Sequence, residues 1–232
     1  LGEQHSKYTT SRSGVNFFLE WFTEQNLWSV MLDARHETYE PEYLLEREKE
    51  SEESQRTSYS VGIQDSLIFL EEALIVTPAL RYSFIKDELK GGSDIRNDDM
   101  EPISRDDDHL SAQIGVKYHP LDWLTLRANT ARYTRVPSFF ELFGDRGFFT
   151  GNMDLKAETG NNYDAGVEIS RNISNPLIKR ISFNAACFQS DLDDLITRVY
   201  DARGVGKSVN ISSSQIRGIE MGLNLDFLKY FR

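Results

Sequence analysis

Hydrophobic and polar residues alternate with a period of two along most of the chain. Over residues 163–170, Tyr, Ala, Val and Ile fall on one face, and Asp, Gly, Glu and Ser fall on the other. The same pattern runs over residues 110–118 and 219–227. Successive side chains of a strand point to opposite sides, so this pattern predicts strands with one apolar and one polar face. A helix would spread the same residues around its circumference.

Less regular alternation predicts further strands. They lie at residues 15–21, 28–34, 59–69, 74–84, 124–128 and 181–190. Pro78 interrupts one of them and lacks the N–H group that a sheet needs, but the alternation around it is long enough to retain the strand. We expect about ten strands, several of them long enough for a tilted membrane crossing of about 9–11 residues. Strands of ordinary globular proteins have a mode near 5–6 residues.

The connections between these strands alternate between short and long. The short ones are expected at residues 24–26, 71–73, 119–122 and 172–179, and the long ones at 40–56, 87–108, 136–160 and 191–208. Residues 42–53 could form a short helix, although their charge density favours a solvated loop. Hairpins with tight turns at one end and long loops at the other are typical of outer-membrane barrels. The fold class that we predict is all-β, an antiparallel up-and-down meander.

Composition narrows the possible functions. Acidic residues outnumber basic ones by 37 to 26, which gives a formal charge of -11. An acidic surface repels phosphate backbones, so we expect no nucleic-acid partner. No apolar run is long enough for a membrane-spanning helix, which leaves a membrane β-barrel open. The single cysteine, Cys187, excludes an internal disulfide, and the start at Leu1 without a signal peptide indicates a piece of a longer protein.

Several short motifs follow one another in a specific order. Residues 131–145 read Ala-Arg-Tyr-Thr-Arg-Val-Pro-Ser-Phe-Phe-Glu-Leu-Phe-Gly-Asp, and residues 151–159 read Gly-Asn-Met-Asp-Leu-Lys-Ala-Glu-Thr. Thr-Pro-Ala-Leu-Arg-Tyr at 77–82, Tyr-Asp-Ala-Gly at 163–166, Asp-Asp-Leu-Ile at 193–196 and Ile-Arg-Gly-Ile-Glu at 216–220 complete the series. This series resembles the barrels of TonB-dependent outer-membrane receptors. Met153 and Ala157 depart from it, because the family often has proline at both positions.

The resemblance implies a fold, a place and a function. The family barrel has roughly 22 strands, so about ten strands over residues 1–232 imply a partial barrel domain without its plug and C-terminal strands. The implied location is the Gram-negative-type outer membrane, in contact with its lipid. The implied function is energy-dependent uptake of a large scarce solute, a ferric siderophore first and cobalamin next. TonB would supply the energy through the plug, with no cofactor and no enzymatic chemistry.

Two groups of site residues follow from the long loop at 136–160 and from the motifs. Its aromatic rings and one arginine are candidates for ligand capture at an extracellular vestibule, or alternatively pack the loop against the barrel rim. They are Phe139, Phe140, Phe143, Arg146, Phe148 and Phe149. The residues that the family motif carries have an expected structural role, with carboxylates pairing with arginine and backbone N–H groups. They are Arg135, Pro137, Glu141, Asn152, Asp154, Leu155, Glu158, Arg217, Gly218 and Glu220.

Polar positions elsewhere suggest weaker hypotheses. Asp98, Asp99 and residues 106–108 crowd one predicted loop beside His109, where they could bind calcium or form a solvated acidic loop. The solvated loop is the preferred interpretation, because the spacing does not match an EF-hand. A barrel lumen would be lined by the polar strand faces, which hold Arg81, Arg127, Asn129, Asp164, Glu168, Glu220, Asn224 and Asp226.

Two other classes of protein remain as alternatives. A soluble β-rich adhesion or carbohydrate-binding module would explain the acidic charge and the alternation, but not the sorted loop lengths. An enzyme carried on a barrel is disfavoured because the chain has no Gly-x-Ser-x-Gly elbow and no evident Ser/His/Asp arrangement. In a membrane barrel, the apolar strand faces would touch lipid. In the soluble module, they would touch a second sheet.

Overall fold

The computed structural model describes residues 6–43, 53–90, 102–144, 149–174 and 177–227. They form one ten-stranded sheet in the order β1-β2-β3-β4-β5-β6-β8-β9-β10-β7. Its elements are β1 (Ser6–Phe22), β2 (Asn26–Tyr43), β3 (Ser54–Phe69), β4 (Leu74–Leu89), β5 (Ile103–Leu121), β6 (Leu124–Arg135), α1 (Phe139–Phe143), β7 (Phe149–Thr150), β8 (Glu158–Asn172), β9 (Ile178–Tyr200) and β10 (Gly206–Phe227). The predicted all-β meander is confirmed, with nine long antiparallel strands and the two-residue β7.

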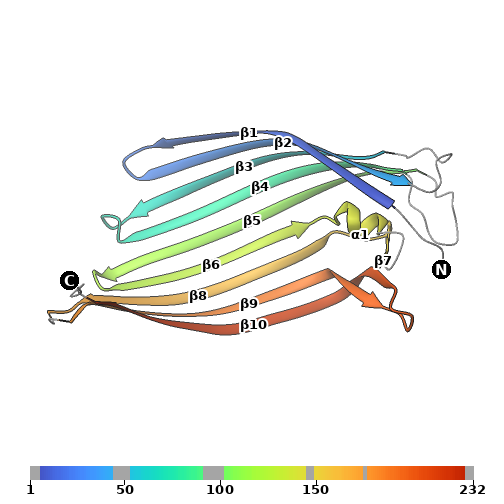
Figure 1. Ribbon diagram of the computed structural model, residues 1–232. Coiled ribbons are helices and arrows are strands. Elements are labelled where there is room, and N and C mark those ends of the chain that lie inside the picture. The colour runs from blue at the N-terminus through green and yellow to red at the C-terminus, as the bar shows by residue number, and fades with distance from the viewer. Residues whose placement is uncertain (1–5, 44–52, 91–101, 145–148, 175–176, 228–232) are drawn as a thin grey trace, which may run out of the picture.

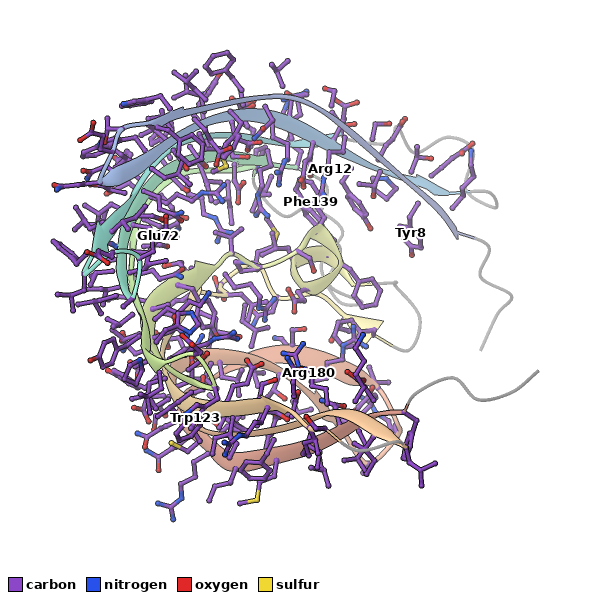
Figure 2. The ribbon with its side chains drawn as sticks, turned by 90° about the vertical axis from the view of Figure 1, so that its left-hand side faces the viewer. Tyr8, Arg12, Glu72, Trp123, Phe139 and Arg180 are labelled. Atoms are coloured by element: carbon purple, nitrogen blue, oxygen red, sulfur yellow. The ribbon has the colours of Figure 1, made fainter. Side chains whose placement is uncertain are left out.

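The sheet curls into a trough with a polar concave face and an apolar convex face (Figures 1 and 2). The convex face carries the apolar half of each alternating pattern. Val15 is 73% exposed, Ile219 is 70% exposed and Met221 is 71% exposed, which is unusual for such large side chains. Cys187 also lies on this face and is exposed. In the part of the chain that the structure describes, no second sheet covers these residues.

The connections are sorted by end of the sheet, as expected. Tight turns join β1 to β2, β3 to β4 and β5 to β6 at one end, and the longer connections lie at the other end with α1 (Figure 1). Two long connections are shorter than we expected. The strands β4 and β5 take up both ends of the 87–108 interval, and β9 continues through Tyr200, which leaves residues 201–205 as the loop. Apart from β7, the strands have 12–23 residues, and they extend well beyond the alternating segments from which we predicted them.

The described end of the predicted acidic loop is strand. Asp106, Asp107 and Asp108 lie on β5, where they face Lys86, Ile85 and Phe84 of β4 in register. Alternation sends neighbouring carboxylates to opposite faces of the sheet, so these residues do not converge. Among the described residues, no three metal-ligating side chains are grouped to hold an ion. Residues 98 and 99, and most of the 42–53 segment, lie outside the described residues.

Pro78 lies inside β4, as predicted, at a gap in the ladder. The β3–β4 register runs to Gln64 opposite Ala79 and resumes at Leu67 opposite Val76. Pro78 falls between these two pairs, where its missing N–H costs no hydrogen bond to β3. The described residues contain no helix that is long and apolar enough to cross a membrane.

The predicted loop at 136–160 contains regular structure that we did not expect. Residues 139–143 form the helix α1, residues 149–150 form β7, and β8 already begins at Glu158. This loop folds back into the concave side of the sheet (Figures 1 and 2). It brings most of the buried apolar side chains with it, so the small core of the described chain lies inside the trough.

Candidate functional site

The most organised region of the concave face is the connection between β6 and β8. We call residues 136–144 and 149–157 the inner segment. Its apolar side chains form a core with residues from the strand ends around it. The core consists of Tyr39, Leu89, Phe139, Leu142, Phe143, Met153, Leu155 and Ile196, with Tyr8 and Ile103 packed against it. Strands β2, β4 and β9 therefore contact one shared element.

Local sequence determines where α1 begins and ends. Ser138 is the N-cap, and its hydroxyl accepts a hydrogen bond from the Glu141 N–H while the Glu141 carboxylate accepts from the Ser138 N–H at 2.8 Å. Gly144 ends the helix with φ of 71°, and its N–H donates to the Phe140 carbonyl at 2.8 Å. A methyl group at Gly144 would overlap backbone atoms of Phe149, so this position requires glycine.

A buried ion network joins the inner segment to β3, β4 and β5. Asp87 is 1% exposed and accepts from Nε of Arg56 at 2.6 Å and from a terminal nitrogen of Arg56 at 2.7 Å. Arg105 donates to the same carboxylate at 3.1 and 3.2 Å. Two arginines thus surround one carboxylate, and Arg56 itself is only 6% exposed. Breaking such a buried pair leaves an uncompensated charge.

The two arginines use their remaining donors on the inner segment. Arg56 donates to the carbonyl of Pro137 at 2.8 Å, and its guanidinium lies 5.2 Å from the ring centre of Phe139. Arg105 donates to the carbonyl of Leu155 at 3.2 Å. Arg56, Asp87 and Arg105 were absent from our sequence-based site. Only their pairing across neighbouring strands reveals them, because they are 31 and 18 residues apart in the chain.

A second network holds the other side of the segment. Arg135 pairs with Glu141 at 3.1 Å and with Glu158 at 3.1 Å. Glu158 is 5% exposed and also accepts from the Tyr133 hydroxyl at 3.2 Å and the Ile196 N–H at 3.2 Å. The structure thus places three motif residues, at 135, 141 and 158, in contact, in the arrangement expected for a scaffold.

The pKa of Glu141 reflects this environment. Burial on its own disfavours the charged carboxylate, but hydrogen bonds from the Ser138 N–H, from Arg135 and from the Ser138 hydroxyl outweigh it. The pKa of Glu141 therefore lies below its usual value, and the carboxylate that caps α1 stays ionised at neutral pH.

Side-chain amides fasten the segment to β10. Asn152 donates to the carbonyl of Ser208 at 3.0 Å. Asn210 accepts from the Lys156 N–H at 2.9 Å and donates to the Lys156 carbonyl at 3.1 Å and the Asp194 carbonyl at 2.7 Å. The short β7 adds parallel pairing to residues 206 and 207 of β10. The inner segment consequently bridges the trough from β2–β5 to β9–β10.

The remaining motif residues have varied positions. Pro137 and Leu155 are fully buried, whereas Asp154 is exposed. Gly218 lies beside the ring of Phe188 on β9, so that a side chain there would overlap the ring. In register, Gly218 and Glu220 face the concave side and Arg217 faces the convex side.

The candidate aromatic residues separate into two groups. The rings of Phe139 and Phe143 stack with Tyr39, at 5.6 and 5.1 Å between ring centres, and are buried. Phe140 is 39% exposed and stacks on the buried Phe149 at 4.9 Å. This placement favours packing as the role of the first group. Arg146 and Phe148 lie outside the described residues.

An arginine that the sequence did not reveal joins the second group. The guanidinium of Arg198, on β9, lies 5.3 Å from the ring centre of Phe140 and 5.1 Å from that of Phe149. Arg198 is itself exposed, so this cation and the Phe140 ring face solvent at the end of the sheet that carries the long loops. Nothing in the sequence indicates that this residue of β9 would contact the 136–160 loop.

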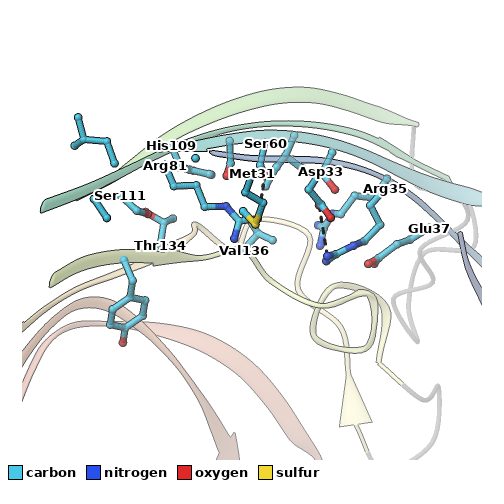
Figure 3. A pocket seen from close by; sticks show the side chains of 18 of the residues that line it. Met31, Asp33, Arg35, Glu37, Ser60, Arg81, His109, Ser111, Thr134 and Val136 are labelled. Carbon is cyan, nitrogen blue, oxygen red and sulfur yellow. Dashed lines mark hydrogen bonds and ion pairs between the residues drawn. The ribbon is translucent and has the colours of Figure 1, made fainter. Parts of the chain in front are cut away.

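Beside the inner segment lies a cavity of about 1080 Å³, bounded by the concave faces of β1–β6 (Figure 3). Its wall combines apolar and polar side chains and carries both charges. Arg12 pairs with Glu37 at 2.6 Å, and Arg35 lies 3.5 Å from Asp33. The predicted lumen residues of the other half also pair across strands, with Arg127 3.2 Å from Glu168 and Asn129 2.8 Å from Asp164.

Comparison with known proteins agrees with this architecture. Residues 3–232 match the model of the family described as TonB dependent receptor-like, beta-barrel. Transferrin-binding protein A of Neisseria meningitidis serogroup B is 29% identical over 128 residues, which is 51% of this chain and 13% of that protein. The chain therefore spans a small part of this curated relative.

Solved structures share the fold at low sequence identity. The copper transporter OprC superposes with a TM-score of 0.76 at 16% identity, covering 97% of this chain and 35% of that one. The FrpB iron transporter from Neisseria meningitidis gives 0.67 at 18% identity, covering 96% and 34%. The siderophore receptor PirA from Acinetobacter baumannii gives 0.63 at 15% identity, covering 95% and 35%.

Proposed function

The chain belongs to the TonB-dependent receptors, whose barrel model it matches over residues 3–232, and we propose that residues 1–232 form a section of such a receptor's barrel domain. The barrels of this family lie in the Gram-negative outer membrane, and the family comprises receptors rather than enzymes. The chain covers 35% of the copper transporter and 35% of the siderophore receptor with which it superposes, which supports a section rather than a whole barrel. The plug and the remaining strands belong to the complete receptor, and TonB acts through that plug.

The convex face is the surface that touches lipid in this proposal. Its side chains are large, apolar and exposed, and Val61, Ile63 and Leu80 form a continuous band on neighbouring strands. A soluble module would bury such a band against a second sheet, which is not present in the described ranges. The band therefore supports a membrane barrel over the adhesion or carbohydrate-binding alternative.

The proposed cargo is a ferric siderophore, with cobalamin as the second choice. The relatives in iron and siderophore transport support iron as the cargo element, although copper transport occurs among them. The observation that carries a capture site is the exposed ring of Phe140 beside Arg198 at the long-loop end. A ring face with an adjacent cation suits a bulky ligand that has flat groups and negative charge.

The capture site is tested in the complete receptor, purified in detergent. Ferric catecholate siderophores, ferric hydroxamate siderophores and cobalamin are titrated separately against the wild type and Phe140→Ala. Loss of ring packing and of the cation contact predicts about tenfold weaker binding, equivalent to about 1.4 kcal/mol. The matched control is Val199→Ala, because Val199 is the exposed neighbour of Arg198 on β9.

Three results would count against this proposal. Equal affinity in Phe140→Ala and Val199→Ala removes Phe140 from the capture site. If cobalamin binds and no iron complex does, the cargo is cobalamin rather than a ferric siderophore. No binding of either class removes the proposed cargo classes altogether.

A protein-borne source of iron is the second candidate. It rests on the 29% identity over 128 residues with transferrin-binding protein A. The same receptor preparation, exposed to iron-loaded and iron-free transferrin, distinguishes it from the siderophore proposal. Retention of transferrin on the immobilised receptor, with no affinity for free ferric siderophores, favours the second candidate.

A further inference from the structure

One arginine of the cavity wall has an environment unlike that of the others. Arg81 lies in the middle of β4, opposite Gly62 of β3 and Ser111 of β5. Figure 3 shows its side chain reaching into the cavity beside Met31. Gly62 has no side chain, so it leaves the space over the neighbouring strand open to the guanidinium.

Arg81 differs from the other arginines of this wall in its partners. Arg12 and Arg35 each have a carboxylate, Glu37 and Asp33, within ion-pair distance. Among the described residues, Arg81 has a single partner, the hydroxyl of Ser60, to which it donates at 3.2 Å. A guanidinium has five N–H donors in a planar fork, so most of the donors of Arg81 remain available.

The groups around Arg81 are hydroxyls and an imidazole. The Ser60 and Ser83 hydroxyls lie 3.0 Å apart, and Ser111 also lines the cavity. His109 lies opposite Ser83, diagonal to Arg81 across the sheet, and its Nε2 is buried without a hydrogen-bond partner among the described residues. A buried polar atom without a partner is costly, so a ligand that supplied one would gain from it.

We propose that Arg81, Ser60, Ser83 and His109 form a binding site for a carboxylate or another oxyanion. We call it the Arg81 site. A planar oxyanion accepts two parallel N–H bonds from a guanidinium, and the hydroxyls supply further donors. Among the described residues, no acidic side chain lies within ion-pair distance of Arg81.

The oxyanion has two possible sources with the same chemistry. It is either a carboxylate of another part of the receptor that fills the trough, or an acidic group of a solute that passes through it. The first source is permanently present and stabilises the receptor without any addition. The second source stabilises the receptor only when the anion is supplied.

The complete receptor, purified in detergent without cargo, distinguishes these sources. The temperature at which the folded band is lost on unheated gels is measured for the wild type, Arg81→Gln and Arg81→Lys. Each is measured without added anion and over a titration of sodium acetate or inorganic phosphate against sodium chloride. The control is Arg171→Gln, which removes an exposed arginine from the opposite, convex face of β8, away from the cavity.

Each outcome supports or overturns the Arg81 site. A lower transition temperature in Arg81→Gln without anion, with Arg171→Gln unchanged, identifies an internal carboxylate. An anion-dependent rise whose midpoint concentration increases about tenfold in Arg81→Gln identifies a solute group. Arg81→Lys should retain part of either effect, because it keeps the charge but loses the fork. Equal behaviour of Arg81→Gln and Arg171→Gln in both measurements overturns the site, and neither measurement depends on uptake.

Discussion

Neutralising Asp87 should release the inner segment from the wall of the trough. Asp87→Asn keeps the shape of the side chain but leaves Arg56 and Arg105 without their shared counter-charge. The side chains of Asp87 and Arg56 are 2% and 7% exposed, so water cannot replace the lost carboxylate. Arg105 is less buried, at 22%, and recovers part of its solvation.

The size of the effect follows from this burial. Removing one partner of a buried ion pair costs about 3–5 kcal/mol. Asparagine keeps one acceptor oxygen and Arg105 is partly solvated, so we expect the lower end, about 3 kcal/mol. Because about 1.4 kcal/mol corresponds to one factor of ten, local opening of the inner segment becomes about a hundredfold more frequent.

Hydrogen exchange of the complete receptor measures this opening directly. The reporting amides are those of Leu142, Gly144 and Asn152, which donate to carbonyls within the segment at 3.0, 2.8 and 3.0 Å. Their exchange should accelerate about a hundredfold in Asp87→Asn, while amides in the middle of β8 keep their rates. Only the amides of the inner segment should change, because the substitution weakens the attachment of that segment and leaves the hydrogen bonds between strands intact.

The neighbouring Glu88 provides a matched control. Its carboxylate pairs with Lys86 at 3.0 Å, but both side chains are nearly half exposed. Such a surface pair contributes little to stability, so Glu88→Gln should change exchange by less than about fivefold. Equal exchange rates in Asp87→Asn and Glu88→Gln would refute the view that the buried network holds the inner segment.

Three further predictions concern the helix cap, a glycine and the two faces of the sheet. The pKa of Glu141 is depressed, so the stabilisation that its carboxylate gives α1 is complete above the ordinary value of 4.5 and is lost as the pH falls through the lower folded value. Pepsin should cleave the inner segment increasingly below that pH, and Glu141→Gln should remove this pH dependence of cleavage. Gly144 and Gly204 both have left-handed φ, of 71° and 80°, but of these two only Gly144 lacks room for a methyl group. Thermal melts should show a loss of stability of about 1 kcal/mol for Gly204→Ala and a larger loss for Gly144→Ala. Ile63→Arg on the convex face should lower stability in bilayers by about 2–4 kcal/mol, measured by urea titration, while Gln64→Arg on the concave face is tolerated.

The alternating pattern was sufficient to predict the sheet, because it reports which face of each strand meets lipid and which meets the lumen. Met31 falls on the polar side of this pattern, and the structure places it in the cavity wall. The pattern could not predict strand ends. Beyond the apolar band the alternation no longer marks a strand, and β5 starts five residues before Asp108, the predicted end of the preceding loop.

The motifs include Arg135, Glu141 and Glu158, and the expected pairing of their carboxylates with arginine is seen among these three residues. They could not predict Arg56, Asp87 and Arg105, whose meeting depends on the register of three strands. Arg198 was missed for the same reason. Residue type alone left two roles open for the aromatic loop, ligand capture and packing. Phe139 and Phe143 belong to the core of the element that folds inward, which agrees with packing.

A signal for this inward folding was nevertheless present in the sequence. In the middle of the strands, the concave positions are small or polar, as at Ser58, Ser60 and Ser83. At the strand ends, the same face instead carries Tyr39 and Leu89, which are 5% and 0% exposed. The inner face of a water-filled barrel opening is expected to be polar. Their position requires an apolar element inside the trough, and the connection rich in phenylalanine is the one that supplies it. Apolar packing is not the whole of its attachment, because buried arginines of the wall also donate to the backbone carbonyls of Pro137 and Leu155.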